Sequence, residues 1–493
     1  MTRSKALITY YGNDPTYLGI AWELAAEVRA AGDEPIMFDM TDVSQGLGDT
    51  YNRRVLKLFR RESPDRHLRR LLRDEGIATV RAAVPRDHGS DYAGVDLAVN
   101  SALISLARDP QPNLDRARWR RLKSAMERAG VDTHFAVTRL LENNPDVRTV
   151  FVANGRLPNQ RAVADATRKL GRALRVYEKG NLKDTYWLED FSPHKRTKTQ
   201  AHADHKLSGF TADEALEMGT RWAEERSSSE SDSNLYSRFF DDELDVSIAH
   251  SRRTVVGLFT SSQDEFASLG EEWQNQSWDD QIEAFDHVIC TLRQQGIQFY
   301  LRVHPNFITK SHASFVRERA QILALGAKHP SLKIFWHDEP ASTYALLEAS
   351  DCVVVWNSTV GLEASGMKLP VYHLAPSYYD LYADVRPWLS PEQNPKPDDL
   401  LYKPDADRAK RFMAYLSVRD RTMSDQSLEI RDTLDTKHGV AAFVAGLAAS
   451  GGAPNARIAF SSIADTVRHR RIGVTYQAVR SAIAQRVNRA TRR

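Results

Sequence analysis

The sequence predicts an α/β protein of two Rossmann-like, doubly wound domains facing a cleft, with a helical insertion in the first domain and a basic C-terminal helical tail. Three observations support this prediction. A chain of 493 residues is too long for one hydrophobic core. Short β-favouring runs alternate with helical patterns in both halves, as in parallel sheets covered by helices. The polar stretch "ERSSSESDSN" separates the halves and predicts a linker within residues 225–250.

We therefore expect domains at residues 1–235 and 236–450, and a tail at residues 451–493. A composition with 42% hydrophobic and 27% charged residues is ordinary for a soluble globular protein. The apolar runs are too short to cross a bilayer, and the first residues show no secretory signal. We expect a cytoplasmic protein, at most peripheral on the inner face of the cell membrane. Cys290 and Cys352 are too few for a disulfide framework and are expected to be buried, reduced thiols.

The first half begins with a β-loop-α-β unit. "ALITYY" predicts a strand, "LGIAWELAAEVRAAG" a helix, and "PIMF" a second strand. Residues 50–145 have mostly helical patterns with polar connections. The alternation returns in "VRTVFVANGRLPNQRAVADATRKLGRALRVYEKG", which predicts a strand, a turn, a helix ending near Gly171 and another strand.

The second half alternates more regularly. "TVVGLF" predicts a strand, residues 260–276 a long polar loop, and Ser277 to Asp280 a capping box. The apolar face of the next helix is formed by Ile282, Phe285, Ile289 and Leu292. The strands then expected are "FYLRV", "LKIFW", "CVVVW" and "LPVYHL", with helices around 311–327, in "ASTYALLEAS" and after "CVVVW".

Positive charge is concentrated in two segments, although the net charge is only +2. Residues 51–75 hold nine Lys or Arg against four acids, and residues 456–493 hold nine Arg against one acid. Residues 468–493 are basic and roughly amphipathic, which suits an anionic membrane surface, an acidic polymer or nucleic acid. A solvated terminal helix is the alternative. Nucleic acid is the weakest of these partners, since no RNA-binding motif or zinc pattern accompanies the charge, and we expect no nucleic-acid partner.

The segment "VVVWNSTVGLEASGMKLPVYHL" predicts an anion site. A buried strand ends there, and Asn357, Ser358 and Thr359 occupy the turn into the next helix. Their side chains and the free N–H groups of the new helix favour a phosphate. Glu363, about one turn further on, is placed to accept hydrogen bonds from ribose hydroxyls. Ordinary helix capping is the alternative interpretation.

His304 ends the strand in "FYLRVHPN", and Pro305 keeps its backbone extended. Ligands of open parallel sheets sit beyond the carboxyl ends of the strands, so His304 and the Ser358–Thr359 turn are expected to converge on one phosphate from two neighbouring strands. A histidine beside an anion favours its protonated, donor form. Arg302 shares the side of the strand to which His304 points. A satisfied core or surface histidine is the alternative.

Ser261 and Ser262 begin the loop at residues 260–276 and are further candidate donors to phosphate or sugar. An ordinary surface loop explains them equally well. No Asp-x-Asp follows a strand, and no zinc-ligand spacing, Walker motif or Gly-x-Ser-x-Gly elbow occurs. We therefore expect neither a metal nor a cofactor, and we expect neither an ATPase nor a hydrolase of the nucleophile-elbow type.

The pair "RVHPN" and "WNSTVGLEASGMKLPV" resembles the nucleotide-binding half of GT-B glycosyltransferases, above all bacterial capsule and surface-polysaccharide biosynthesis proteins. The similarity covers roughly residues 250–380 and extends more distantly to teichoic-acid polymerases. It implies that the His-Pro and the Ser/Thr turn hold the phosphates of a nucleotide-activated sugar donor. The loop at residues 260–276 is expected to cover that donor or the cleft.

A second stretch, residues 151–180, is similar to the Asn-Gly-Arg segment of capsule-synthesis proteins. The matching positions are Asn154, Arg156 and Arg161, followed by Glu178. Asn154, Arg156 and Arg161 are expected to bind polar or anionic groups of an acceptor, and Glu178 is the candidate base for the acceptor hydroxyl. A glycine turn with a surface arginine and a solvated glutamate is the alternative.

The leading hypothesis is a metal-independent glycosyltransferase of capsule or surface-polysaccharide synthesis. Its partners would be a nucleotide-sugar donor and a glycan or lipid-linked acceptor. A nucleotide-sugar epimerase is the second hypothesis, although the sequence shows no obvious acid and base pair for it. A non-catalytic polysaccharide-assembly or polymer-binding protein is the third, with the basic tail as its main functional element.

Overall fold

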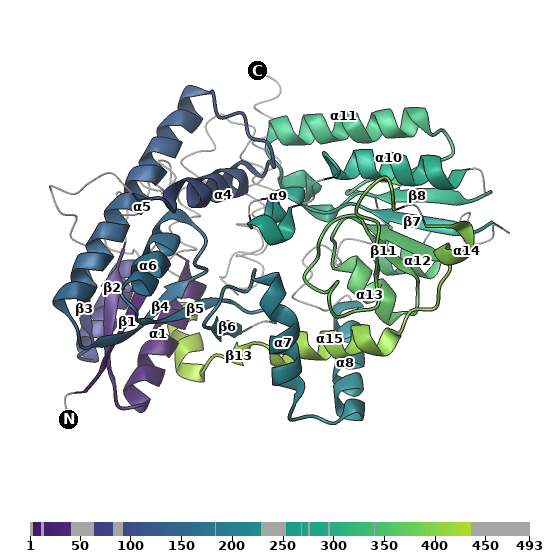
Figure 1. The fold of residues 1–493 in the computed structure, drawn as a ribbon. Coiled ribbons are helices and arrows are strands. Elements are labelled where there is room, and N and C mark those ends of the chain that lie inside the picture. Colours follow the sequence, from purple (N-terminus) through teal and green to yellow (C-terminus); the bar gives the residue numbers. More distant parts are fainter. Residues whose placement is uncertain are drawn as a thin grey trace, which may run out of the picture.

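Two parallel-sheet domains form the protein, shown in a computed structural model (Figure 1). The structure describes residues 3–10, 14–40, 64–81, 92–182, 184–227, 253–267, 269–274, 277–293, 296–339, 341–393 and 395–434. The expected linker beyond residue 227, most of the basic segment at residues 51–75 and the whole tail at residues 451–493 lie outside these ranges.

The first domain contains a seven-stranded sheet with the order β13-β6-β5-β4-β1-β2-β3. Its strands are β1 (Lys5–Tyr10), β2 (Glu34–Asp39), β3 (Ala78–Arg81), β4 (Val147–Ala153), β5 (Ala173–Lys179), β6 (Thr185–Glu189) and β13 (Arg421–Thr422). β1 to β5 pair in parallel, whereas β6 and β13 are antiparallel to their neighbours. The strands β3 and β6 were not predicted. All residues of β3 are exposed, so it shows no alternating apolar pattern, and β6 lies in the polar stretch that follows β5.

Helices cover this sheet and extend beyond it. They are α1 (Pro15–Ala30), α3 (Pro64–Asp74), α4 (Val95–Ala107), α5 (Ala117–Asn143) and α6 (Pro158–Lys169). Asp14 caps α1 by accepting a hydrogen bond from the Thr16 N–H at 3.0 Å. α4 and α5 lie in the largely helical segment between β3 and β4 that the sequence indicated.

The second domain contains a six-stranded, all-parallel sheet with the order β12-β11-β10-β7-β8-β9. Its strands are β7 (Val255–Phe259), β8 (Gln298–Arg302), β9 (Lys333–Phe335), β10 (Cys352–Val355), β11 (Val371–His373) and β12 (Arg386–Pro387). Its helices are α9 (Gln263–Phe266), α10 (Gln281–Leu292), α11 (His312–Lys328), α12 (Thr343–Glu348), α13 (Val360–Gly366), α14 (Pro397–Leu400) and α15 (Ala406–Val418), with 3-10 turns η3 (Glu271–Trp273) and η5 (Pro305–Thr309). The predicted doubly wound fold class is therefore confirmed.

The chain crosses between the domains more than once. α7 (Arg196–Leu207) and α8 (Ala212–Ser227) contribute Leu207 and Trp222 to the hydrophobic core of the second domain. After α15, β13 joins the first sheet, and Met423 packs into the core of the first domain. A linear division into residues 1–235 and 236–450 thus does not follow the packing at these two places.

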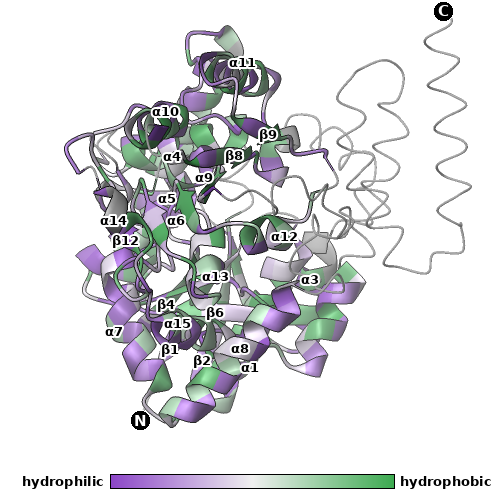
Figure 2. Cartoon of the chain, turned by 90° about the vertical axis from the view of Figure 1, so that its right-hand side faces the viewer, coloured by the Kyte–Doolittle hydropathy of each residue, from purple (hydrophilic) through white to green (hydrophobic). Residues whose placement is uncertain are grey.

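The α8–α15 crossing depends on a glycine. A Cβ at Gly219 would lie only 1.9 Å from the Lys410 carbonyl oxygen, so the two backbones meet where a side chain has no room. Elsewhere, the helices have one buried and one solvated face, and α10 and α11 show bands of both hydrophobic and hydrophilic residues (Figure 2).

Two local predictions need correction, while the apolar face expected on α10 is buried. α10 begins at Gln281 with Asp280 as its cap, since the Asp280 carboxylate accepts from the N–H groups of Ile282 and Glu283. The start at Ser277 was therefore wrong by one turn. Both cysteines are free, but only Cys352 is buried, whereas Cys290 is exposed. No helix within the described ranges reaches the length and apolar character that a membrane span requires.

Candidate functional site

The candidate donor residues lie at the carboxyl edge of the second sheet. Arg302 of β8 pairs with Phe259 of β7, and Phe259 pairs with Val355 of β10. His304 and Asn357 each follow two residues later, so they flank Ser261 at one level of the sheet. Adjacent strands are about 4.8 Å apart, which separates β8 from β10 by about 10 Å. His304 and the Asn357 turn are therefore on one edge but not on neighbouring strands, because β7 lies between them.

This edge is also where the strand order reverses. β8 and β9 lie on one side of β7, and β10 to β12 lie on the other. Ligands of doubly wound sheets bind outside the carboxyl ends at this switch point. Ser261, at the end of β7, connects the two sides because its Oγ accepts a hydrogen bond from the Asn357 N–H at 3.3 Å.

The turn from β10 into α13 differs from its prediction in one respect. The N–H of Val360 donates to Ser358 Oγ at 3.4 Å, and the N–H of Gly361 donates to the Ser358 carbonyl at 3.0 Å. The first N–H groups of the helix are thus partly satisfied within the turn, so the side chains offer more to a ligand than the helix end does. Thr359 Oγ1 accepts from the Tyr378 hydroxyl at 3.3 Å.

Three hydroxyl groups of this edge keep a proton to donate. Ser261, Ser358 and Thr359 each use the side-chain oxygen as an acceptor, and no residue within the described ranges accepts a hydrogen bond from any of the three. A hydroxyl carries one donor as well as its lone pairs. Asn357 adds an acceptor, since its Oδ1 is buried without a donor and the residue is only 1% exposed. The edge therefore combines donors suited to an anion with one acceptor suited to a hydroxyl.

His304 is held as a neutral ring. The backbone N–H of His304 donates to Thr260 Oγ1 at 2.8 Å, and the ring Nδ1 accepts from the backbone N–H of Asn306 at 3.1 Å. Burial, together with the nearby charges of Lys310, Arg302 and Arg108, lowers the pKa of His304 to about 4. The protonated form expected beside a bound anion stays a prediction, while this environment favours the neutral ring before a ligand binds. Nδ1 is the acceptor, so Nε2 carries the proton, and no described residue accepts from it.

Three other predicted donor residues have mainly structural partners. Arg302 is 2% exposed, and its guanidinium donates to the Trp336 carbonyl. Ser262 is buried immediately before α9. Glu363 pairs with Arg226 of α8, with 3.0 Å between Oε1 and Nε, so one oxygen of the predicted ribose ligand is already engaged.

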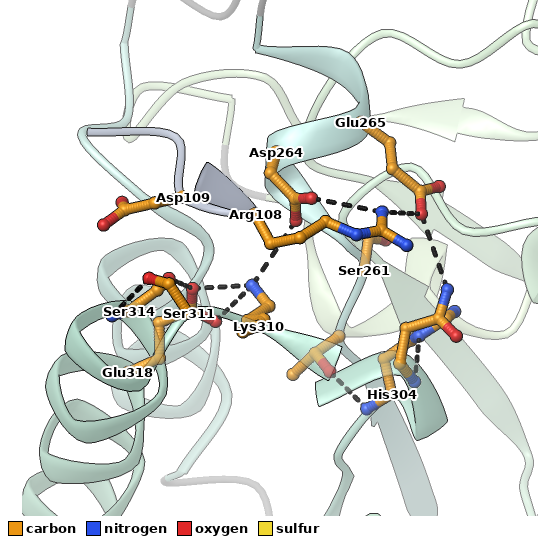
Figure 3. A network of polar contacts seen from close by, with 12 residues as sticks. Arg108, Asp109, Ser261, Asp264, Glu265, His304, Lys310, Ser311, Ser314 and Glu318 are labelled. Carbon is orange, nitrogen blue, oxygen red and sulfur yellow. Dashed lines mark hydrogen bonds and ion pairs between the residues drawn. The ribbon is translucent and has the colours of Figure 1, made fainter. Parts of the chain in front are cut away.

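A network of charges beside His304 joins the two domains (Figure 3). Arg108, which follows α4, contacts Asp264 at 3.4 Å and Glu265 at 3.2 Å. Glu265 Oε1 also accepts from Asn306 Nδ2 at 3.4 Å. Lys310 is buried and binds both carboxylate oxygens of Glu318 at 2.6 and 2.7 Å.

The candidate acceptor residues lie at the carboxyl edge of the first sheet. Asn154 and Gly155 both have positive φ, 57° and 74°, which turns the chain sharply after β4. Asn154 Nδ2 donates to Glu178 Oε2 at 2.5 Å, and the Tyr17 hydroxyl and the Lys179 N–H donate to Glu178 Oε1. Glu178 is therefore held by three donors, and these hydrogen bonds fix the orientation of its carboxylate.

The two predicted acceptor arginines point in different directions. Arg156 Nη1 donates to Ser101 Oγ at 2.8 Å and to Ser105 Oγ at 3.2 Å, so it contacts α4. Arg161 lies 3.5 Å from Asp165 one turn along α6. Asn154, Arg156 and Glu178 are brought together at the turn after β4, whereas Arg161 pairs with Asp165 on its own helix.

One group of potential metal ligands occurs among the residues that the structure describes. It comprises Asp286, Cys290 and His329 on α10 and after α11. Asp286 is already bound by Lys328 at 2.6 Å and by His329 at 2.7 Å. The cluster is accounted for by these ion pairs and does not touch the edge around His304.

Fold and site together define a protein of two doubly wound domains with a set of hydrogen-bond donors at the switch point of the second. The chain matches no protein-family model. It also matches no curated protein.

Solved structures resemble the chain at low identity. The β-Kdo 2,4-transferase KpsC of Thermosulfurimonas dismutans has a TM-score of 0.37 and 12% identity over 58% of this chain and 88% of that one. MurG of Acinetobacter baumannii has a TM-score of 0.27 and 10% identity over 88% and 99%. The UDP-GlcNAc 2-epimerase of Methanocaldococcus jannaschii has a TM-score of 0.28 and 8% identity over 84% and 99%. These are likenesses in fold alone, and the function proposed below rests on the site geometry.

Proposed function

We propose that the chain is a glycosyltransferase of capsule or surface-polysaccharide synthesis that binds a nucleotide-sugar donor at the carboxyl edge of the second sheet. The observation that carries this proposal is a group of donors at the switch point that find no acceptor among the described residues: the hydroxyls of Ser261, Ser358 and Thr359, and Nε2–H of His304. Phosphate oxygens are acceptors only, so they match this group. The unpaired Oδ1 of Asn357 suits a ribose or sugar hydroxyl.

In the proposed reaction, an acceptor hydroxyl attacks the anomeric carbon of the donor sugar. The bond from that carbon to the phosphate oxygen breaks, and the nucleoside phosphate leaves with the bonding electrons. Hydrogen bonds from His304 and the hydroxyl turn offset the charge that grows on the leaving oxygen. The proposal assigns this task to protein donors and requires no metal. A nearby carboxylate, with Glu178 as candidate, takes the acceptor proton.

The acceptor is proposed to bind at the first domain. Support comes from Asn154, Arg156 and Glu178, which follow β4 and end β5 at the carboxyl edge of the first sheet. Arg156 is anchored on α4 by two serine hydroxyls, which orients its guanidinium for a polar or anionic group of a glycan or lipid-linked glycan. Attachment of the tail at residues 468–493 to an anionic membrane would bring a lipid-linked acceptor close.

A nucleotide screen by thermal shift tests donor binding first, because a ligand of the folded state raises the melting temperature. We expect at least one of UDP, CDP, CMP, GDP and ADP to stabilise the wild type and to stabilise His304→Ala less. Sugar transfer is then measured with the matching nucleotide sugar in the presence of EDTA. Unchanged transfer by His304→Ala would overturn the proposed role. Turnover of the nucleotide sugar without any acceptor would instead identify an epimerase, and no binding of any nucleotide would favour a non-catalytic assembly protein.

A further inference from the structure

Arg108 has a strained backbone at the boundary between the domains. It follows α4 with φ of 48° and ψ of 44°, a left-handed conformation that is costly for a residue with a side chain. The conformation directs the guanidinium across the boundary, where Nη1 contacts Asp264 Oδ2 at 3.4 Å and Glu265 Oε1 at 3.2 Å. Both carboxylates belong to α9, which follows β7 of the second domain.

The contact continues to His304 through one carboxylate oxygen (Figure 3). Glu265 Oε1 accepts from Arg108 and also from Asn306 Nδ2 at 3.4 Å. The N–H of the same Asn306 donates to His304 Nδ1 at 3.1 Å, which fixes the ring tautomer. Arg108 in the first domain is therefore two side chains away from the ring that is proposed to bind the donor phosphate.

The helix before Arg108, α4, also contacts one of the candidate acceptor residues. Ser101 and Ser105 on α4 accept hydrogen bonds from Arg156. Arg108 follows Ser105 by three residues, less than one helical turn, so α4 links the two points as a rigid element. The helix that precedes Arg108 is therefore in direct contact with one of the candidate acceptor residues.

We propose that Arg108 is a positioning residue for His304, and that α4 couples ligand binding beside Arg156 to phosphate binding at His304. The second part rests on the proposed function. The relative orientation of the domains would then control the geometry of the donor site. When Arg108 contacts Glu265, the turn at Asn306 is fixed and Nε2 of His304 points to the ligand. When this contact is broken, the turn is released. Two ligands coupled in this way bind with reciprocal effects on affinity.

The interface supplies a matched control. Asp109, the next residue, forms ion pairs with Arg317 of α11 at 2.5 and 3.3 Å. This pair crosses the same boundary, and within the described part of the chain neither of its residues forms a hydrogen bond with residues 304–306. Arg317→Gln therefore removes a contact between the domains and leaves the turn after His304 unchanged. Arg108→Gln removes a contact between the domains and also releases that turn.

The test compares full-length wild type, Arg108→Gln, Arg108→Lys and Arg317→Gln by titration with inorganic pyrophosphate, which presents the phosphates without any base. We expect Arg108→Gln to weaken pyrophosphate binding about fivefold or more, Arg108→Lys to recover part of the loss, and Arg317→Gln to stay within about twofold. Equal losses in Arg108→Gln and Arg317→Gln would reduce Arg108 to a structural contact and overturn the proposal. If Arg108→Gln does not fold, Glu265→Gln is measured against the same control.

A second readout needs no ligand. The charged groups that face the His304 ring are Lys310, Arg302 and Arg108, and each cation disfavours its protonation. Removing Arg108 is therefore expected to raise the His304 pKa, followed by NMR of the ring Cε1–H, while Arg317→Gln leaves it unchanged. An unchanged His304 titration in Arg108→Gln contradicts the positioning role. Failure of the wild type to bind any nucleotide or pyrophosphate would instead refute the proposed function. The NMR measurement would still test the link between Arg108 and His304, because it needs no ligand.

Discussion

Removing the charge of Glu318 tests how the turn after His304 is anchored. Lys310 ends η5, and its ammonium is buried against Glu318, with the two side chains only 3% and 7% exposed. Ser314 Oγ adds a hydrogen bond to Glu318 at 2.9 Å. Breaking a buried ion pair by removing one partner costs about 3–5 kcal/mol, because the remaining charge stays desolvated. Asp264 Oδ1, 3.8 Å from the Lys310 ammonium, offsets part of this cost, so we expect a loss of about 3 kcal/mol for Glu318→Gln.

Urea unfolding of wild type, Glu318→Gln and the double variant Lys310→Met/Glu318→Leu measures this loss. The double variant removes both charges and should recover to within about 1 kcal/mol of wild type. Glu217→Gln is the control for an exposed pair, since Glu217 and Arg221 are 75% and 61% exposed, and its loss should stay below about 0.5 kcal/mol. A Glu318→Gln loss as small as that of Glu217→Gln would show that the buried pair does not anchor the turn.

Three further predictions follow from the same contacts. The low pKa of His304 means that, between about pH 6.5 and 4, the unfolded chain binds a proton that the folded chain does not, so the free energy of unfolding falls as pH falls through this window. In chemical unfolding, His304→Asn should therefore gain stability relative to wild type on acidification. A stability difference that stays constant with pH would contradict the low pKa of His304. Gly155→Ala should lower the free energy of unfolding by about 1–2 kcal/mol, because of the positive φ at this position alone. Gly219→Ala should lower it clearly more, since the added Cβ would lie 1.9 Å from a carbonyl oxygen of α15. Equal melting temperatures of the two variants would refute this difference. Tyr17→Phe removes one donor from Glu178 and should change sugar transfer without changing nucleotide affinity, and a matching change in nucleotide affinity would argue against separate donor and acceptor sites.

Local sequence patterns were enough to predict most of the second domain. Its strands are short, apolar and separated by helices of normal length, and the face of α10 formed by Phe285 and Ile289 is buried as expected. In the first domain the same rules missed β3, which has no buried residue to create a pattern, and β6, which pairs antiparallel next to a polar stretch.

Most of the candidate site residues that the sequence indicated follow the ends of strands. His304 and Asn357 are such residues, since the edge of a parallel sheet brings strand ends together. The partners of these residues come from distant segments and leave no local signal: Arg226 meets Glu363 from 137 positions away, and Arg108 meets Glu265 from 157 positions away. The neutral state of His304 was also missed, because it depends on burial and on charges that only the folded chain assembles.

Tyr17 and Asn306 are two of the candidate-site residues that sequence reasoning left out. Tyr17 lies in the first turn of α1 and has no motif around it, so only the fold reveals its contact with Glu178. Asn306 did carry a signal, since it follows His-Pro directly in "RVHPN". Its backbone N–H donates to the ring Nδ1 of His304, which thereby caps the turn that begins at Pro305.

The most direct measurement is a crystal structure of the protein with the nucleoside diphosphate that gives the largest thermal shift. The account predicts phosphate oxygens within hydrogen-bonding distance of His304 Nε2 and of the Ser358 and Thr359 hydroxyls, above the end of β7. Phosphates bound at the first sheet, or at a surface that none of these three residues touches, would contradict it.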